Sequence, residues 1–330
     1  MIPRAVRLVT VLAGSAVIFW LVSRAGPWVI WSMLRDVGWA LVPIAVLYAI
    51  HVALRAVALW WALPDGLLPL GDILRVRVAG EIVEVFTFTG PWLAEPTKGW
   101  LLVRHGLGVA DAVGYIALEY LLYTIVAGWM AATALAVLWF RPALPGFMAG
   151  PVLGIEVVVF AVTVACVHAV LTGRGIIAST LRRGGRRGAA LAAKVAPAED
   201  VLVRFMSTRK ARLLEVLVIQ VVGHALLAAE IAIVFRELHL PSSFSDPLIF
   251  EGATKFIATA FFFVPGQVGA QEGVYTLIAG ALGAPAAAGL TLALARRLRN
   301  VLVGAVGLLL VSLTSSRSGA LRRAPGPASE

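Results

Sequence analysis

The chain has 330 residues, of which 60% are hydrophobic and only 14% are charged, against about a quarter charged in a typical soluble domain. A soluble fold of this size cannot bury so much apolar surface, whereas a lipid bilayer can. The formal charge of +10 therefore fits basic loops beside an anionic membrane surface better than it fits nucleic-acid binding.

Six apolar stretches are long enough to cross a bilayer, which takes about 20 residues of helix. They lie near 5–23, 38–62, 110–139, 149–172, 213–235 and 286–315. The first stretch follows Arg4 and Arg7, so a cleaved signal peptide is the alternative to a retained first helix.

The basic residues predict the orientation of the chain. The segment 173–212 carries ten Lys and Arg against two acids, and the tail 317–330 carries three Arg against one acid. The positive-inside rule places both segments, and the N-terminus, on the cytoplasmic side of a cell inner membrane. Nearly neutral loops around Arg35 and Arg236 suit the opposite side, and 186–206 is expected to form an interfacial amphipathic helix.

Two further apolar stretches, 71–107 and 248–284, are interrupted by proline and glycine, which break helices. We expect each to form a helical hairpin that enters and leaves on one side, the first from the cytoplasm and the second from outside. The expected break residues are Gly90, Pro91, Pro265, Gly266 and Gly269.

The order of a span, a broken hairpin and a long span occurs twice with opposite predicted orientation, which is typical of inverted repeats in transporters. The sequence thus predicts an all-α polytopic membrane protein forming a single domain, 1–330. It has about six full transmembrane helices and two re-entrant hairpins, with halves at 1–172 and 213–316. The alternative is eight ordinary spans.

Charged side chains inside apolar stretches are costly and by default indicate function. The candidate residues for binding a lipid headgroup or a proton are Glu81, Glu84, Glu95, Lys98, Glu119, Glu251, Lys255, Gln271, Glu272, Arg296 and Arg297. One interpretation is a polar cavity lined from both halves, in which arginine binds phosphate. The other is that Glu95–Lys98, Glu251–Lys255 and a Glu272–arginine pair only neutralise one another. With eight ordinary spans, Arg296 and Arg297 would lie in a loop.

Other polar residues of the spans are weaker candidates. His51 and Arg55 lie four apart in the second span, and Gln220, His224 and Glu230 form a polar face of the fifth. The sequence has no zinc-protease, nucleophile-elbow or P-loop motif, and no His/Cys set with zinc spacing. We therefore expect no enzymatic activity, no cofactor and no metal.

Two segments resemble a known family. They read TGPWLAEPTKGWLLVRHG at 89–106 and FFFVPGQVGAQEGVYTLIAGALGAPAAAGLTLALARRLRN at 261–300. Both are similar to signatures of the lysylphosphatidylglycerol synthase transmembrane-region family, a flippase-like membrane domain, and the arrangement also resembles its hopanoid-biosynthesis-associated branch. The first tip departs from the Gly-Glu of many members, since it reads Leu93-Ala94-Glu95.

The resemblance implies a role in moving or handling a lipid at the cytoplasmic membrane. Only a short basic tail follows the membrane region, so we expect no aminoacyltransferase domain and no synthase activity. Our leading hypothesis is a lipid flippase or lipid transporter, with phospholipid, hopanoid or polyprenyl carrier as candidate substrates. The alternative is a non-transporting membrane subunit that positions a lipid- or hopanoid-modifying enzyme through the basic segment 173–212. A membrane enzyme with an unrecognised site is a third hypothesis.

Overall fold

A computed structural model describes residues 23, 27–87, 91–139, 149–260, 264 and 267–321 of the chain. All regular secondary structure in these residues is helical, which confirms the all-α fold. The predicted first span, 5–23, lies almost wholly outside the described residues.

Long helices form the bundle, and three of them are long and apolar enough to cross a membrane: 27–62, 109–137 and 210–237. The long helices of the bundle are α2 (Pro27–Val37), continued through η1 (Gly38–Ala40) into α3 (Leu41–Ala62), then α6 (Val109–Trp139), α7 (Ala149–Thr172), α10 (Lys210–Glu237) and α13 (Ala286–Leu321). Apolar side chains on their outer surfaces are exposed, for example Leu153 and Phe160 on α7 and Leu309 on α13. Such a surface needs lipid around it, and the protein is a multi-pass membrane protein.

Each interrupted stretch forms a pair of packed helices. The pairs are α4 (Leu70–Thr87) with α5 (Pro91–Arg104), and α11 (Ser245–Ala260) with α12 (Ala270–Ala281). All four helices are shorter than the ~20 residues that a full crossing needs. Two of the expected break residues bound helices, since Pro91 opens α5 and Gly269 caps α12 with a positive φ of 82°; Gly90, Pro265 and Gly266 lie outside the described residues.

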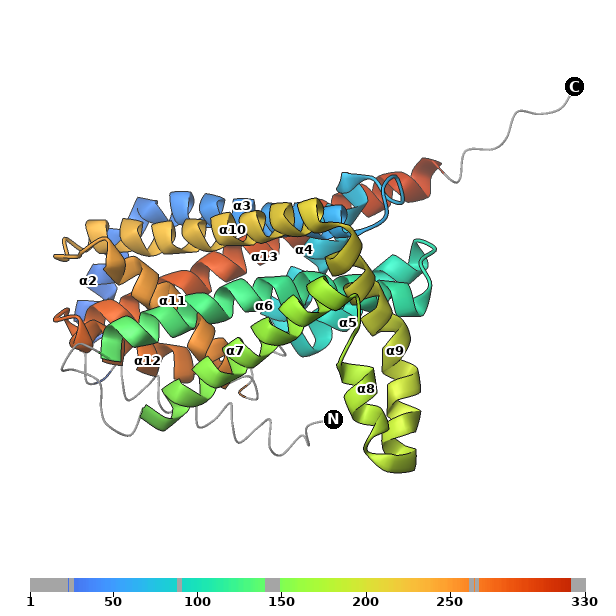
Figure 1. Cartoon of the computed structure of the whole chain (residues 1–330). Coiled ribbons are helices and arrows are strands. Elements are labelled where there is room, and N and C mark those ends of the chain that lie inside the picture. The colour runs from blue at the N-terminus through green and yellow to red at the C-terminus, as the bar shows by residue number, and fades with distance from the viewer. Residues whose placement is uncertain are drawn as a thin grey trace, which may run out of the picture.

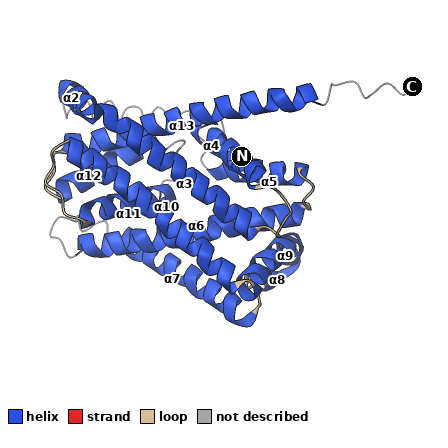
Figure 2. Ribbon diagram, turned by 90° about the horizontal axis from the view of Figure 1, so that it is seen from above, coloured by secondary structure: helices blue, strands red, loops and turns tan. Residues whose placement is uncertain are grey.

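The two halves run in opposite directions. In Figure 1, α3 and α6 run in the opposite sense to α10 and α13, respectively. The α4–α5 pair lies toward one end of the bundle and the α11–α12 pair toward the other. The packing is reciprocal, because α11 packs along α6 of the first half, and α4 packs along α13 of the second. Seen from above in Figure 2, the same helices remain bundled side by side.

The repeat has a constant register over its second part. Helix α5 ends at Arg104 and α6 begins at Val109, while α12 ends at Ala281 and α13 begins at Ala286. Both boundaries differ by 177 positions (281 − 104 and 286 − 109). The connecting loops each hold a glycine in the left-handed region at matching places, Gly106 with φ 98° and Gly283 with φ 78°, where other residues are strained.

Three sequence-based expectations are wrong. Arg35 and Arg236 lie in the last turns of α2 and α10 and not in loops, because each helix continues past its apolar residues to these charged ones. The sequence places the tip of the first hairpin at 89–96, but the tip does not extend to Pro96, because Pro91 occupies the first turn of a helix, where proline is tolerated, and Pro96 lies inside that helix. Arg296 and Arg297 lie inside the continuous helix α13, so the loop cluster of the eight-span alternative is excluded.

The basic segment folds into two further helices, α8 (Ile177–Arg182) and α9 (Gly185–Thr208). They run across the axis of the long helices at the end of the bundle where α3 ends (Figure 1). The buried carboxylate of Glu199 on α9 accepts hydrogen bonds from the backbone N–H groups of Ile177 and Ala178, at 2.7 and 2.8 Å. Glu199 thereby satisfies amide groups that the start of α8 leaves free and ties the two helices together.

Close approach of α11 to α6 depends on a residue without a side chain. A Cβ atom at Gly252 of α11 would lie 2.5 Å from Cβ of Ala134 and 2.7 Å from the carbonyl oxygen of Met130, both on α6. A Cβ atom at Gly280 of α12 would meet nothing within 4 Å.

We predict that Gly252→Ala lowers the thermal unfolding midpoint of the purified protein in detergent, because overpacking costs about 1–3 kcal/mol. Gly280→Ala is the matched control and should leave the midpoint unchanged or raise it, because alanine favours a helix by about 1 kcal/mol. A midpoint raised by both changes would contradict the close packing of α11 on α6.

Candidate functional site

Charged side chains from both halves meet inside the bundle, in what we call the charged network. Among the described residues, it contains seven carboxylates and seven cations. The carboxylates belong to Glu81, Glu84, Glu95, Glu119, Glu230, Glu251 and Glu272. The cations belong to Arg55, Arg77, Lys98, Lys255, Arg296, Arg297 and Arg299. They come from α3, α4, α5, α6, α10, α11, α12 and α13, so every helix of both hairpins contributes.

In the first half, Glu119 of α6 is the centre of the network. Arg55 of α3 donates two hydrogen bonds to its carboxylate, at 2.8 and 3.0 Å, and Gln220 of α10 donates a third at 3.4 Å. The Lys98 ammonium on α5 lies 3.9 Å from Glu119 and 2.6 Å from Glu95, one turn earlier on the same helix. Lys98 is fully buried, so these two carboxylates must supply its compensating charge.

Helix α4 packs its own ion pair against this centre. Arg77 pairs with Glu81 one turn later, at 3.2 Å, and the Tyr48 hydroxyl of α3 donates a hydrogen bond to Glu81. A Cβ atom at Gly80 would lie 2.8 Å from the alkyl chain of Lys98. Glycine at this position therefore makes room for the Lys98 side chain between the two helices of the hairpin.

In the second half, Glu251 of α11 is the corresponding centre. Its carboxylate pairs with Lys255 at 2.9 Å, one turn later on the same helix, and with Arg296 of α13 at 3.0 Å. The Arg296 guanidinium also donates to the Tyr275 hydroxyl at 2.8 Å and to the Thr254 hydroxyl at 3.0 Å. All of these side chains are buried or half-buried. The two terminal nitrogens of Arg296 donate hydrogen bonds within the protein, whereas its Nε has no hydrogen-bond partner among the described residues and lies 3.8 Å from the Glu230 carboxylate.

A second ion pair ties α10 to α13. Arg299 donates to the carboxylate of Glu230, which also lies 3.8 Å from Arg296. The guanidinium of Arg299 stacks on the ring of Tyr48, 3.7 Å from its centroid. Because Tyr48 also hydrogen bonds to Glu81, it links an ion pair of the first half to one of the second.

The tip of the second hairpin holds its own pair. Glu272 in the first turn of α12 accepts a hydrogen bond from the backbone N–H of Gly269 at 2.9 Å. Arg297 of α13 pairs with the same carboxylate and donates to the carbonyl oxygen of Gln267 at 3.2 Å. The predicted Glu272–arginine contact thus forms. Gln271 lies half-buried one residue earlier on the same turn.

Aromatic rings join the two halves at the middle of the network. Arg55 lies over the Tyr123 ring at 3.9 Å, and the Tyr123 hydroxyl accepts a hydrogen bond from Lys255 at 2.9 Å. The His224 ring stacks on Tyr123 with centroids 4.9 Å apart, and the His51 ring lies 6.3 Å from each of them. Cation–π contacts of this kind stabilise buried cations by about 2 kcal/mol when desolvated.

The matched register explains which residues occupy equivalent places. Glu272 follows Glu95 by 177 positions (272 − 95), and Arg296 follows Glu119 by the same number (296 − 119). Equivalent acids therefore lie on α5 and α12, in the first turn of α12 but beyond the first turn of α5, whereas an acid on α6 corresponds to a base on α13. The two halves are complementary in charge at this position and not copies of each other.

The sequence leaves two interpretations of these charges, a polar cavity lined from both halves and pairs that only neutralise one another. In the structure the pairs Glu95–Lys98, Glu251–Lys255 and Glu272–Arg297 form. Among the ion-paired side chains of the network, those of Glu95 and Arg297 are the most exposed, at 16% and 25%, and the Glu84 side chain is half-buried as well. Most of the network is therefore shielded, and its more exposed charges lie on α4, α5 and α13.

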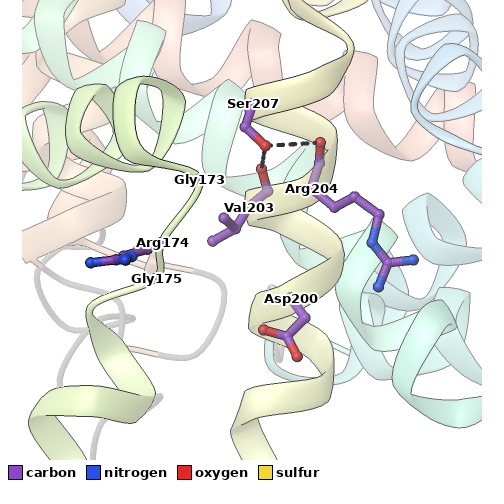
Figure 3. Close-up of a pocket in the computed structure, with 7 residues that line it drawn as sticks. All are labelled: Gly173, Arg174, Gly175, Asp200, Val203, Arg204 and Ser207. Atoms are coloured by element: carbon purple, nitrogen blue, oxygen red, sulfur yellow. Dashed lines mark hydrogen bonds between the residues drawn. The ribbon is translucent and has the colours of Figure 1, made fainter.

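A described pocket of about 530 Å³ lies elsewhere, between the end of α7 and helix α9. It is lined by Gly173, Arg174, Gly175, Asp200, Val203, Arg204 and Ser207. Figure 3 shows that Arg174 and Arg204 point to opposite sides, while the Ser207 hydroxyl donates to the Val203 carbonyl at 2.7 Å. The charged side chains of the pocket do not converge on one point, and we assign no function to it.

The charged candidates predicted from the sequence meet in the network. Other residues of the network were ranked low or not named from the sequence. Arg55, Gln220, His224 and Glu230 were only weak candidates, and Arg299 was not among the candidates. Four members that the sequence reading passed over are Tyr48, Arg77, Tyr123 and Tyr275. Arg77 lies four residues before Glu81, a helical spacing that could have identified it. The tyrosines offer no such signal, because apolar helices commonly contain them.

We predict that Arg55→Met lowers the stability of the protein by about 3–5 kcal/mol, because it leaves the buried Glu119 carboxylate without its main partner. Arg212→Met is the matched control, because Arg212 forms an exposed pair with Glu215 at 2.9 Å and such pairs contribute about 0–1 kcal/mol. The thermal unfolding midpoint in detergent measures both. Equal shifts for the two variants would contradict the importance of the buried pair.

Comparison with known proteins gives a family. The family model described as the lysylphosphatidylglycerol synthase TM region matches residues 6–307, which include both hairpins and the whole charged network. No curated protein and no solved structure was found to match the chain. The match concerns the family as a whole, so the resemblance to its hopanoid-associated branch stays a prediction. Because the family model covers most of the sequence, the chain belongs to the lysylphosphatidylglycerol synthase transmembrane-region family, whose members are lipid-related membrane proteins.

Proposed function

We propose that this protein is a flippase or transporter that moves a lipid headgroup across the cytoplasmic membrane without changing it chemically. The observation that carries the proposal is the burial of the charged network where two inverted halves meet. In secondary transporters built from inverted repeats, substrate sites lie at the repeat interface, near the middle of the membrane. Ionisable residues at that depth mark substrate pathways by default.

The chemistry of the network suits a polar headgroup. Arginine binds phosphate through two parallel hydrogen bonds, and carboxylates bind ammonium groups. A headgroup can enter only by replacing an internal partner, because the side chains of the network already pair with one another. Glu95 and Arg297, the more accessible members, are the positions at which this exchange begins.

Alternating exposure follows from the opposed hairpins. The α4–α5 and α11–α12 pairs lie toward opposite ends of the bundle, and we propose that each is re-entrant from its own side. Opening of one hairpin would expose the network to one side of the membrane, while the other hairpin keeps it closed to the other side. The basic segment 173–212 lies at the end of the bundle nearer α4–α5, which the positive-inside rule assigns to the cytoplasm.

Headgroup transfer in proteoliposomes tests the proposal. Vesicles containing the purified chain are loaded with fluorescent phosphatidylglycerol or phosphatidylethanolamine in both leaflets, and dithionite then bleaches the outer leaflet. We expect wild-type protein to make the inner-leaflet lipid accessible, and Glu272→Gln to slow this at least tenfold, because it removes the negative charge that pairs with Arg297.

Glu215→Gln is the matched control, because Glu215 is exposed and pairs only with Arg212 among the ion pairs that the structure describes. It should flip lipid at the wild-type rate. Equal rates in wild type, Glu272→Gln and protein-free vesicles would refute the flippase proposal.

A second candidate function is a membrane subunit that positions a lipid-modifying enzyme. The observation that favours it is the α8–α9 pair, which is held together by Glu199 and exposes Arg182, Arg186, Arg187 and Lys194. This surface would bind an acidic face of the partner.

The two functions make opposite predictions about substitution in cells that depend on the protein. If it is a subunit, Arg186→Glu with Arg187→Glu abolishes complementation, whereas Glu272→Gln is tolerated. If it is a transporter, Glu272→Gln abolishes complementation and the α8–α9 variant retains most of it. Growth of complemented cells, with protein amounts measured in membranes, decides between them.

A further inference from the structure

We propose that His224 binds a coupling proton, and that this proton gives the charged network the positive charge with which it accepts an anionic lipid headgroup. The inference rests on the proposed transport function and adds the driving ion and the charge class of the substrate. It starts from the position of His224 on α10, at the contact between the two halves.

One ring nitrogen of His224 forms a hydrogen bond, and the other can accept a proton. Its side chain is fully buried, and Nδ1 lies 3.4 Å from the carboxylate of Glu251. A carboxylate only accepts hydrogen bonds, so Nδ1 carries the hydrogen and Nε2 holds the lone pair. Within the described part of the chain, Nε2 has no hydrogen-bond partner. A proton from water can therefore add to Nε2 and form a second N–H bond.

Charged and titratable groups face His224 from each neighbouring helix of the network. The list is Glu251 and Lys255 from α11, His51 and Arg55 from α3, Tyr123 from α6, and Arg296 from α13 through Glu251. Lys255 and Arg296 already share the Glu251 carboxylate. A protonated His224 would be a third cation on one carboxylate, so the region would hold an excess positive charge.

The net charge of the network shows which kind of headgroup this excess positive charge would compensate. When all seven carboxylates are ionised, all seven cations are charged and both histidines are neutral, the charges of the described network sum to zero. A phosphodiester headgroup without an amine adds one negative charge, which a buried site tolerates only if it is compensated. One proton on His224 supplies that compensation. A zwitterionic headgroup adds no net charge and needs no proton.

The inference therefore predicts that the protein moves one proton with each anionic lipid, and none with each zwitterionic lipid. At equilibrium, one proton per lipid makes a gradient of one pH unit drive about a tenfold asymmetry of the anionic lipid between leaflets, because one unit corresponds to 1.36 kcal/mol. The lipid accumulates in the leaflet on the alkaline side.

The experiment uses the full-length protein in vesicles with fluorescent phosphatidylglycerol or fluorescent phosphatidylcholine. A pH gradient is imposed while valinomycin and equal potassium on both sides hold the membrane potential at zero. We expect the gradient to accelerate and bias the transfer of phosphatidylglycerol and to leave phosphatidylcholine unaffected. His224→Gln should bring the ratio of rates with and without the gradient to one. His239→Gln is the matched control, because His239 is an exposed residue of a loop. This variant should keep the wild-type ratio.

Wild-type protein also provides a test that needs no variant. Addition of phosphatidylglycerol micelles to the detergent-solubilised protein in weakly buffered solution should remove about one proton per chain from solution, in keeping with the charge balance above. Phosphatidylcholine should remove none. A rate of phosphatidylglycerol transfer that does not depend on the pH gradient, or phosphatidylglycerol binding without proton uptake, would overturn the inference. Neither result would contradict the flippase proposal. Absence of any transfer would refute the flippase proposal itself.

Discussion

The whole arrangement depends on the need to neutralise ionised side chains that are buried inside a membrane protein. An isolated charge in this setting costs several kcal/mol, so each carboxylate must find a cation and each cation a carboxylate. Of the charges in the network, α13 brings three arginines and α6 brings only Glu119, whereas α5 and α11 each bring one acid and one base. The unbalanced helices find partners for their charges only when α3, α6, α10, α13 and both hairpins come together. The need to pair every buried charge therefore also specifies how the helices must pack.

Inversion of the two halves makes this pairing work. Because equivalent positions hold Glu119 and Arg296, an exact structural repeat would still be electrically asymmetric. Each residue finds its main partner within its own half, Arg55 for Glu119 and Glu251 for Arg296. Tyr48 and Tyr123 then connect the halves, since each ring carries a cation of one half and hydrogen bonds to a charged group of the other.

The glycines set the distances at which these contacts form. Gly252 brings α11 against α6, and Gly80 accommodates the buried alkyl chain of Lys98. Close backbone approach through small residues is the usual means by which membrane helices associate, because lipid provides no hydrophobic driving force between them. Packing and electrostatics thus act on the same helices but join them to different neighbours. Gly252 packs α11 on α6 while Glu251 pairs with Arg296 of α13, and Gly80 packs α4 on α5 while Glu81 bonds to Tyr48 of α3.

The sequence by itself determined the environment, the helical class, the two broken stretches and the pairs within one helix. Hydrophobicity identifies membrane helices, and a spacing of three or four residues puts two side chains on one face. Glu95–Lys98 and Glu251–Lys255 follow from these rules. Tertiary structure alone decided that Arg55 meets Glu119, that Glu230 meets Arg299, and that His224 lies between Glu251 and Tyr123. These partners lie on different helices, and the relative rotation and depth of packed helices depend on side-chain contacts that no local spacing encodes. For the same reason the sequence left a polar cavity and self-neutralising pairs as alternatives, whereas the folded protein shows which charges pair.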